Sequence, residues 1–263
     1  MNEQPFFSII TVCYNSEKTI ERTIRSVANQ TCRDYEYIVI DGKSNDDTNE
    51  IIRKVLPIVN AETKYISEKD NGIYDAMNKG IRMSHGRFIC FMNSDDWFED
   101  DALEKVKANY YDFCDKNKND NKKIVLYGGQ KTITNGMEEN CVFYHHQFLK
   151  QNMICHQACF TSRECFDEYG FFNEQYASAA DYDFTLRMFL SEKVIFIPIH
   201  EFLVNFSSGG MNESFIGRFE SNIIRFKNGV ISKKAFRLET MKLKASQFIY
   251  FLLRKKPKKV VMD

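Results

Sequence analysis

The chain has 263 residues, of which 43% are hydrophobic, and its 36 basic and 36 acidic side chains balance to a formal charge of zero. Only 12 Gly and 4 Pro stand against 23 Phe and 13 Tyr, which excludes collagen-like, linker-like and disordered proteins. A chain of this length holds one large domain, or one domain with an appendage, and it can bury a sizeable core.

Charge is distributed unevenly along the chain. The segment 225–259 contains 12 Lys or Arg and one acidic residue, Glu239, which leaves 24 basic and 35 acidic residues elsewhere. This charge distribution favours a C-terminal segment that contacts an anionic surface. It is not typical of a protein that binds nucleic acid through its fold. No apolar stretch reaches the ~18 residues of a membrane span. Because no signal peptide is recognisable, we expect a cytoplasmic protein with reduced cysteines, whose membrane contact is peripheral, at the inner face of the cell membrane.

The first hundred residues alternate strand and helix patterns. Apolar runs predict four strands, and apolar residues at helical spacing predict a helix after each of the first three. Asp47–Glu50 also resembles a capping box that opens the second helix. The predicted strands are 6–12, 35–40, 64–67 and 87–92, and the predicted helices contain 20–27, 47–55 and 73–81. This alternation predicts an α/β fold with a mostly parallel sheet.

Polar residues follow each predicted strand. They are Tyr14-Asn15, Asp41, Asp70-Asn71 and Asn93-Ser94-Asp95-Asp96. In an open parallel sheet such positions line the crevice beyond the carboxyl ends of the strands, where ligands bind. One Asp after a strand is usually only a turn former, but gathered carboxylates repel one another and are best satisfied by a divalent cation or a hydroxyl-rich ligand. Because the chain has neither a dinucleotide-binding nor a Walker-type glycine motif, we expect a metal to hold phosphates.

The second half has shorter strand patterns. We expect Ile124–Tyr127 and Lys131–Thr134 to be antiparallel pieces beside the main sheet. Asp181 precedes a helical pattern and lies near a helix N-terminus, where Asp is also a favoured cap without any chemistry. Asp183 and Arg187 are four residues apart and are predicted to form a structural pair.

These blocks together resemble family 2 glycosyltransferases of the GT-A fold, most closely the bacterial branch that builds surface polysaccharides. Four ordered blocks in the expected strand context form a more specific signal than any one of them. The resemblance covers residues 5–212. The matching segments are 8–15, 37–48, 70–80 and 93–96, with weaker matches at 156–157, 180–183 and 209–210.

The resemblance implies an enzyme that moves a sugar from a nucleotide-sugar, more readily a UDP-sugar than another donor, to the hydroxyl of a glycan or lipid-linked acceptor. It implies that Tyr14 lies against the nucleobase, beside Asn15, and that Asp41 hydrogen-bonds the base edge. Asp70, Asn71 and Asn78 are expected to frame the donor pocket. Asn78, which precedes Lys79-Gly80, can equally mark the end of a helix.

Asn93–Asp96 takes the place of the family's Asp-x-Asp motif, with Asn93 where the first Asp is usual. We expect Asp95 to be a ligand of Mg²⁺ or Mn²⁺, and Asp96 either to assist it or to cap the following turn. The resemblance makes Asp181 the general base of an inverting transfer. His156 is either an acceptor contact or a satisfied core histidine.

The resemblance also suggests how the chain is divided. Residues 1–212 are expected to be the GT-A catalytic domain, with a nucleotide-sugar half over 1–100 and an acceptor half over 101–212, and residues 213–263 a basic helical extension. The apolar run 248–253 beside the basic cluster 254–259 suits either a membrane-surface segment or a helix packed on the body. Two other functions stay open: a sugar-nucleotide pyrophosphorylase, and a non-catalytic nucleotide-sugar-binding subunit recruited to membrane.

Overall fold

A computed structural model describes residues 4–117, 123–208 and 215–254. These residues form two compact units. The first comprises the chain up to Gln175 together with Ala180–Ser208, and the second comprises Tyr176–Ala179 and the described residues after position 214. Within the described part of the chain, no helix is both long and apolar enough to cross a membrane.

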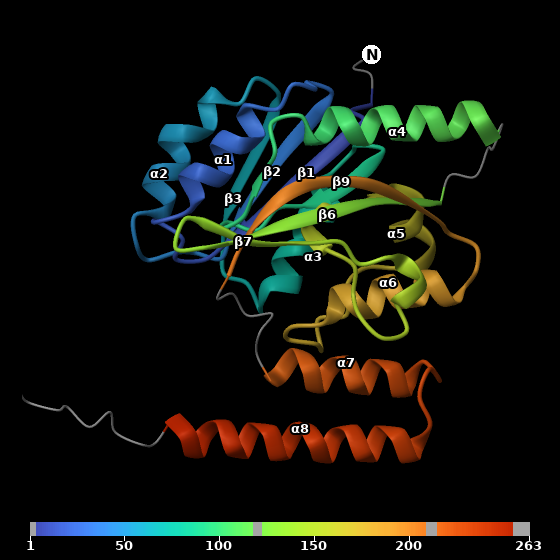
Figure 1. The fold of residues 1–263 in the computed structure, drawn as a ribbon. Helices are drawn as coiled ribbons and strands as arrows, with labels where there is room; N and C mark the ends of the chain where they lie inside the picture. The colour runs from blue at the N-terminus through green and yellow to red at the C-terminus, as the bar shows by residue number, and fades with distance from the viewer. Residues whose placement is uncertain (1–3, 118–122, 209–214, 255–263) are drawn as a thin grey trace, which may run out of the picture. The chain divides into compact units, whose positions relative to one another are not determined.

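The first unit is built on one sheet of nine strands in the order β3-β2-β1-β4-β8-β6-β9-β5, with β7 paired to β6 (Figure 1). The strands are β1 (Phe7–Cys13), β2 (Tyr35–Asp41), β3 (Glu62–Ser67), β4 (Phe88–Phe91), β5 (Trp97–Phe98), β6 (Ile124–Thr134), β7 (Met137–Val142), β8 (Cys159–Ser162) and β9 (Ile195–Ser207). Strands β3, β2, β1 and β4 are mutually parallel, and so are β6 and β9. The predicted α/β fold and its first four strands are confirmed.

Helices cover both faces of this sheet (Figure 1). They are α1 (Ile20–Ala28), α2 (Thr48–Val55), α3 (Ile73–Met83), α4 (Ala102–Asn117), α5 (Arg163–Tyr169) and α6 (Ala180–Leu190), with short 3₁₀ turns η1 (Leu56–Ile58), η2 (His146–Phe148) and η3 (His156–Ala158). Alternation along β1 directs Phe7 and Ile9 into one core with α1, α2 and α4. Ile10 faces α3, where a Cβ on Gly80 would lie 2.4 Å from its side chain. Glycine therefore permits the close packing of α3 on the sheet.

The strand register aligns the polar residues at the carboxyl ends of the strands, which form one edge of the sheet. Cys13, Asp41 and Ser67 are register partners across β1, β2 and β3. Since the strands are parallel, the segments that follow them emerge at the same edge. The edge predicted for ligand binding is therefore formed.

Two local expectations were wrong. Ile124–Tyr127 and Lys131–Thr134 belong to one strand, β6, which lies within the main sheet and pairs antiparallel with β7 and β8 but parallel with β9. Asp47 is the N-cap of α2 but makes no side-chain capping bond. The side chain of Asp46 instead accepts the N–H of Thr48 at 3.1 Å, because the bend before the helix places it over the first turn.

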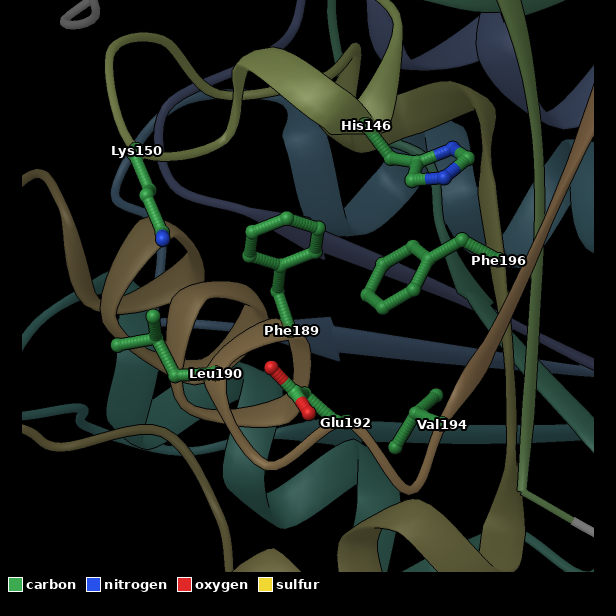
Figure 2. Close-up of a pocket in the computed structure, with 7 residues that line it drawn as sticks. All are labelled: His146, Lys150, Phe189, Leu190, Glu192, Val194 and Phe196. Atoms are coloured by element: carbon green, nitrogen blue, oxygen red, sulfur yellow. The ribbon is translucent and has the colours of Figure 1, made fainter.

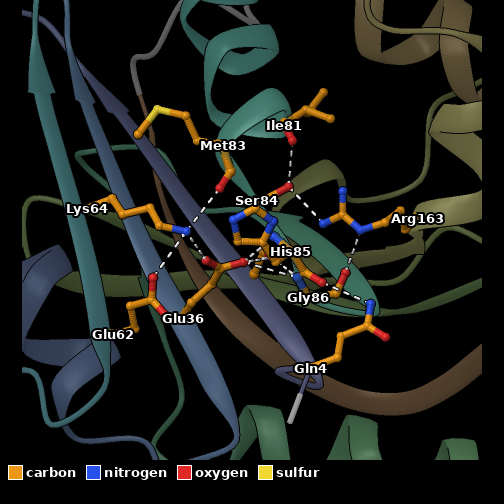
Figure 3. A network of polar contacts seen from close by, with 11 residues as sticks. Gln4, Glu36, Glu62, Lys64, Ile81, Met83, Ser84, His85, Gly86 and Arg163 are labelled. Atoms are coloured by element: carbon orange, nitrogen blue, oxygen red, sulfur yellow. Dashed lines mark hydrogen bonds and ion pairs between the residues drawn. The ribbon is translucent and has the colours of Figure 1, made fainter. Parts of the chain in front are cut away.

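The opposite edge of the sheet is joined by a buried polar network around Glu36 of β2 (Figure 3). Glu36 is fully buried, and its carboxylate accepts hydrogen bonds from Lys64 Nζ at 2.7 Å, from Ser8 Oγ at 2.7 Å and from Gly86 N at 3.0 Å. Burial by itself raises the pKa of Glu36, but Lys64 and the backbone donor of His85 outweigh it and lower that pKa. The network ties the starts of β1 to β4 together.

The second unit contains α7 (Phe215–Lys227) and α8 (Lys233–Arg254), which form a helical hairpin. Asn222 donates to Thr240 Oγ1 at 2.9 Å, and Arg225 forms an ion pair with Glu239 at 2.5 Å. Glu220 of α7 also accepts the backbone N–H groups of Ala177 and Ser178, at 2.7 and 2.8 Å. The short segment Tyr176–Ala179 is thereby fastened to α7.

Candidate active site

The predicted donor residues Tyr14 and Asp70 lie together at the carboxyl edge of the sheet. A Cβ built on Gly42 would lie 2.9 Å from Asp70 Oδ2 and 3.4 Å from the ring of Tyr14. Tyr14 is 62% exposed, which is unusual for a tyrosine at the end of a buried strand. An exposed ring in this position offers a stacking surface for a planar base.

The loops after β1 and β2 are bonded to each other. Asn15, at φ 51°, donates its backbone N–H to Ser44 Oγ at 2.8 Å and accepts from Asn45 N at 3.0 Å. Asp41 is fully buried and accepts from Ser67 Oγ at 2.6 Å, from Asn49 Nδ2 at 3.1 Å and from Ser44. Its carboxylate is already well supplied with donors, so contact with a base edge would require one of these bonds to open. The part of Asp41 in base recognition stays a prediction.

Asp70 and Asn71 lead from β3 into α3. Asp70 pairs with Lys79 at 2.6 Å, and burial raises the pKa of Asp70 despite this cation. Asn71 donates its N–H to Asp75 Oδ2 at 2.9 Å. Both residues are therefore at the predicted edge, beside an ion-paired lysine that the motif analysis did not single out.

Asn78 differs from expectation. It lies inside α3, so the interpretation as a helix end is wrong. It is 2% exposed, donates to Phe172 O at 3.0 Å and to Glu174 Oε1 at 2.8 Å, and accepts from Phe172 N at 3.0 Å. The contacts of Asn78 thus join α3 to the segment before α6, and its predicted place in the donor pocket is a prediction still.

Asp95 and Asp96 differ in their surroundings. The backbone carbonyl of Asp95 accepts hydrogen bonds from Arg22 Nη2 and Ser207 Oγ, both at 2.7 Å. The carboxylate of Asp96, 1% exposed, accepts from Gln157 Nε2 at 2.9 Å and from Ser207 N at 2.8 Å. Asp96 therefore joins β9 and η3, while the carboxylate of Asp95 is better placed to serve a ligand.

Arg22 is a site residue that the sequence analysis missed. Its guanidinium lies 3.7 Å from the centroid of the Trp97 ring and also donates to Ser207 Oγ at 3.1 Å. In the helical pattern of α1, Arg22 falls at a position that is usually exposed. The residues that it contacts are far away in the sequence. No local signal could have identified it.

Asp181 and Asp96 contact neighbouring residues of η3. His156 Nδ1 is 3.8 Å from Asp181 Oδ2, whereas its neighbour Gln157 bonds Asp96. Asp181 Oδ1 accepts a hydrogen bond from Tyr74 OH at 2.8 Å. The short turn η3 thus brings together Asp96 and Asp181, which are far apart in the sequence. The predicted Asp183–Arg187 pair is confirmed, at 3.0 Å.

The electrostatics of the Asp95–Asp96 pair suit a cation. Burial, and next the charge of Asp95, raise the pKa of Asp96 to about 8, and burial raises the pKa of Asp95. Among the described residues no three His, Cys, Asp or Glu side chains form a metal cluster, but Mg²⁺ needs only one or two carboxylates when diphosphate and water complete its shell. Among the described residues, the buried Oδ1 of Asn93, two positions before Asp95 in the chain, has no hydrogen-bond partner. An unpartnered oxygen and neighbouring carboxylates are the ligand types that such an ion prefers.

A pocket of about 320 Å³ lies away from these aspartates, between the end of α6, η2 and the start of β9 (Figure 2). Its lining is His146, Lys150, Phe189, Leu190, Glu192, Val194 and Phe196. The His146 and Phe196 rings are stacked at 5.4 Å between centroids. The pocket contains none of the predicted site residues. Gly209 and Gly210 of the predicted loop lie outside the described residues.

Solved structures with a similar fold include proteins bound to nucleotide-sugars. S. aureus TarS 1-349 in complex with UDP-GlcNAc is 20% identical with a TM-score of 0.63, over 83% of this chain and 66% of that chain. The mannosyltransferase PcManGT from Pyrobaculum calidifontis, in complex with GDP-Man and Mn²⁺, is 17% identical with a TM-score of 0.62, over 87% and 65%. These likenesses establish the GT-A fold.

Sequence relatives agree. A PGL/p-HBAD biosynthesis glycosyltransferase of Mycobacterium bovis is 29% identical over 216 residues, 81% of this chain and 82% of the relative. Chondroitin synthase of Escherichia coli is 33% identical over 218 residues, 80% of this chain but 30% of that protein. The family model described as glycosyl transferase family 2 matches residues 8–170. With that match across more than half of its length, and with the aspartates placed at the carboxyl edge of its sheet, the chain belongs to glycosyl transferase family 2.

Proposed function

We propose that this glycosyltransferase transfers a sugar from a UDP-sugar to an acceptor hydroxyl with inversion, using Mg²⁺ or Mn²⁺ at Asp95 and Asp181 as general base. The observation that carries the proposal is that η3 bonds Asp96, the neighbour of Asp95 in the chain, through Gln157 and approaches Asp181 through His156. A single-step transfer needs a base at the attacking hydroxyl and charge stabilisation at the leaving diphosphate, which Asp181 and an ion at Asp95 would supply.

Each residue has a distinct part in this mechanism. Tyr14 stacks on the base, and the loop of Asn15 borders the donor. Asp95 and the Oδ1 of Asn93 would hold the ion, and a bound ion would supply charge neutralisation for the departing diphosphate. Asp96 holds Ser207 and Gln157 in place around it. Asp181 takes the proton of the acceptor hydroxyl as that oxygen attacks the anomeric carbon.

Two relatives support the choice of donor and ion. TarS 1-349 has been solved with UDP-GlcNAc, and PcManGT with GDP-Man and Mn²⁺. Both nucleotides are diphosphates, whose charge requires a counter-ion in a fold without a glycine-rich phosphate loop. The mycobacterial relative acts in PGL/p-HBAD biosynthesis by its name, and we infer a lipid-linked or glycan acceptor here.

The second unit suits a role in reaching a lipid-linked acceptor. Leu238, Met241 and Phe248 are exposed on α8 and recur at helical spacing, turned away from the face where Phe236 and Thr240 contact α7. Basic side chains flank this apolar stripe on both sides. They are Arg237, Lys242 and Lys244. We propose that α8 lies on an anionic membrane surface.

The metal and the base are tested separately. Asp95→Ala should abolish Mn²⁺-dependent binding of UDP and leave the melting temperature near that of the wild type, because no side-chain bond of the fold is lost. Titration calorimetry with Mn²⁺ or with excess chelator measures this, and Asp115→Ala, which removes an exposed carboxylate of α4, is the control. Equal UDP affinity in chelator and in Mn²⁺ would contradict the metal proposal.

Asp181→Asn should retain UDP affinity and lose about 10²-fold or more in kcat. The assay is release of UDP from UDP-glucose, UDP-galactose, UDP-GlcNAc and UDP-GalNAc. Asp181 lies in the first turn of α6 and is not its N-cap. If its role were only to favour the helix N-terminus, the substitution would cost a small amount of stability and leave kcat unchanged. Turnover by the wild type would exclude a non-catalytic binding subunit, and formation of a nucleotide-sugar from UTP and a sugar phosphate would instead support a pyrophosphorylase.

A further inference from the structure

The Tyr74 hydroxyl is in direct contact with the proposed base. Tyr74 lies in the first turn of α3, is 6% exposed, and donates its hydroxyl hydrogen to Asp181 Oδ1 at 2.8 Å across 107 residues of sequence. Burial, and next the charge of Asp181, raise the pKa of the Tyr74 phenol. The phenol therefore stays protonated at physiological pH and acts toward this carboxylate as a donor.

An aromatic cluster fixes the orientation of this hydroxyl. Phe172 lies 5.6 Å from the Tyr74 ring, 5.3 Å from Phe91 and 6.1 Å from His156, between centroids. His156 is in turn stacked on Phe91 at 5.5 Å and 16°. Rings packed in this way have few alternative rotamers, so Tyr74 and His156 are held on two sides of Asp181.

Asn78 anchors the cluster to α3. Its amide exchanges two hydrogen bonds with the backbone of Phe172, each at 3.0 Å. Tyr74 and Asn78 are four residues apart and lie on one face of the helix. The same helical face therefore fixes both the hydroxyl that touches Asp181 and the ring that orients it.

The two oxygens of Asp181 consequently differ. Oδ1 is occupied by Tyr74, and Oδ2 lies 3.8 Å from His156 Nδ1, beyond hydrogen-bond distance. Burial lowers the pKa of His156 although Asp181 opposes this, so the imidazole is neutral near pH 7. Tyr74, His156 and Cys159 are the titratable groups that face Asp181, from α3, η3 and β8.

We infer that Tyr74 is a positioning residue for the base: its hydrogen bond to Oδ1 directs Oδ2 of Asp181 toward the acceptor hydroxyl, and Asn78 and Phe172 hold it there. The inference rests on the proposed role of Asp181. By this inference, the face of α3 that carries Tyr74 and Asn78 supports the reaction of the acceptor. The motif had instead predicted that Asn78 frames the donor pocket.

The test is Tyr74→Phe, which keeps the ring and removes the hydroxyl. We expect kcat for release of UDP, measured with whichever of the four UDP-sugars the wild type turns over fastest, to fall about tenfold or more, since small misplacements of a reacting group are costly. UDP affinity should stay within about twofold. Tyr35→Phe is the matched control, because Tyr35 is also buried and donates to a backbone oxygen, Val27 O, at 2.9 Å; its kcat should equal that of the wild type.

A double-mutant cycle separates positioning from general stability. If Tyr74 acts through Asp181, the variant with both Tyr74→Phe and Asp181→Asn should be no slower than Asp181→Asn alone. Multiplied losses in the double variant, or wild-type kcat in Tyr74→Phe while Asp181→Asn is inactive, would overturn the inference. Wild-type kcat in Asp181→Asn would instead overturn the proposed function. If the Tyr74→Phe variant unfolds below the assay temperature, the double-mutant cycle with Asp181→Asn is measured with Phe172→Leu in place of Tyr74→Phe.

Discussion

At the scale of single residues, the adjacent Asp95 and Asp96 show how environment separates two chemically identical side chains. Asp96 is enclosed and bonded to Ser207 and Gln157, whereas Arg22 approaches Asp95 only at its backbone carbonyl. The carboxylate of Asp96 therefore organises the loops, and we propose that the carboxylate of Asp95 serves a ligand. A substitution at either position has a different expected consequence.

The raised pKa of Asp96, about 8 against an ordinary 3.8, makes stability depend on pH. Between these two values the folded chain retains a proton that the unfolded chain releases, so stability is greatest at low pH and falls as pH rises toward 8. We expect the melting temperature in chelator to fall between pH 5 and pH 8, and Mn²⁺ to restore it mainly at the higher pH. Differential scanning fluorimetry across this range measures both effects.

Asp96→Asn provides the control for this dependence, because the amide keeps the shape and cannot ionise. Its melting temperature in chelator should vary less with pH than that of the wild type. An unchanged pH profile in Asp96→Asn would show that another group titrates. Asp115→Asn, on the exposed side of α4, should behave as the wild type.

At the scale of elements, the hydrogen bonds of Glu36 join the starts of β1 to β4. The polar residues follow the carboxyl ends of the same strands. The carboxylate of Glu36 is satisfied by charged, hydroxyl and backbone donors from three segments. Buried carboxylates of this kind stabilise only while each donor keeps its acceptor. The geometry at the ligand edge depends on the order that this network imposes on the starts of the strands.

Glu36→Gln should lower the free energy of unfolding by about 2–4 kcal/mol, because its amide NH₂ would face donors in a buried site. Urea denaturation measures the loss. Glu62→Gln is matched to it, since Glu62 also pairs with Lys64, at 3.3 Å, but its side chain is 57% exposed; its effect should be within about 0.5 kcal/mol. A loss of the same size in both variants would mean that Lys64, and not the buried network, dominates.

At the scale of the whole molecule, the second unit extends the chain beyond the glycosyltransferase sheet. It contains the α7–α8 hairpin and the segment Tyr176–Ala179, which directly precedes Ala180 and Asp181 in the chain. The proposed base is thus covalently next to a segment bonded to α7. This connection suits a protein whose acceptor is presented at a membrane surface.

Membrane binding by α8 is expected to require its apolar stripe. Met241→Glu and Phe248→Glu place a charge on side chains that are each 65% exposed, and both should reduce sedimentation with vesicles containing phosphatidylglycerol at least severalfold. Binding of the wild type should weaken steeply with salt and be weak on neutral vesicles, because each basic residue adds at most about 1 kcal/mol at an anionic surface.

Ser246→Glu adds the same charge elsewhere on α8 and is the control for those variants. Its binding should stay close to that of the wild type. Equal losses in Ser246→Glu and Met241→Glu would indicate net charge alone, and equal binding to anionic and neutral vesicles would contradict the electrostatic contribution.

The sequence by itself determined the alternation of strands and helices in the first half, the polar residues after each strand and the family. These are local properties: apolar runs and helical spacing depend on near neighbours, and parallel pairing brings the residues after strands to one edge whatever their distance in the chain. The single strand β6 was predicted as two pieces because Gly128-Gly129 reads locally as a break.

Only the tertiary structure decided which side chains meet. Tyr74 reaches Asp181 across 107 residues, Asn78 reaches Phe172 across 94, and Arg22 reaches Ser207 across 185. Hydrophobic periodicity in the sequence cannot predict such contacts, because they depend on how the helices pack over the sheet. Burial is likewise a property of the assembled fold, and it is burial that distinguishes Asp96 from Asp95 and keeps the Tyr74 phenol protonated beside the proposed base.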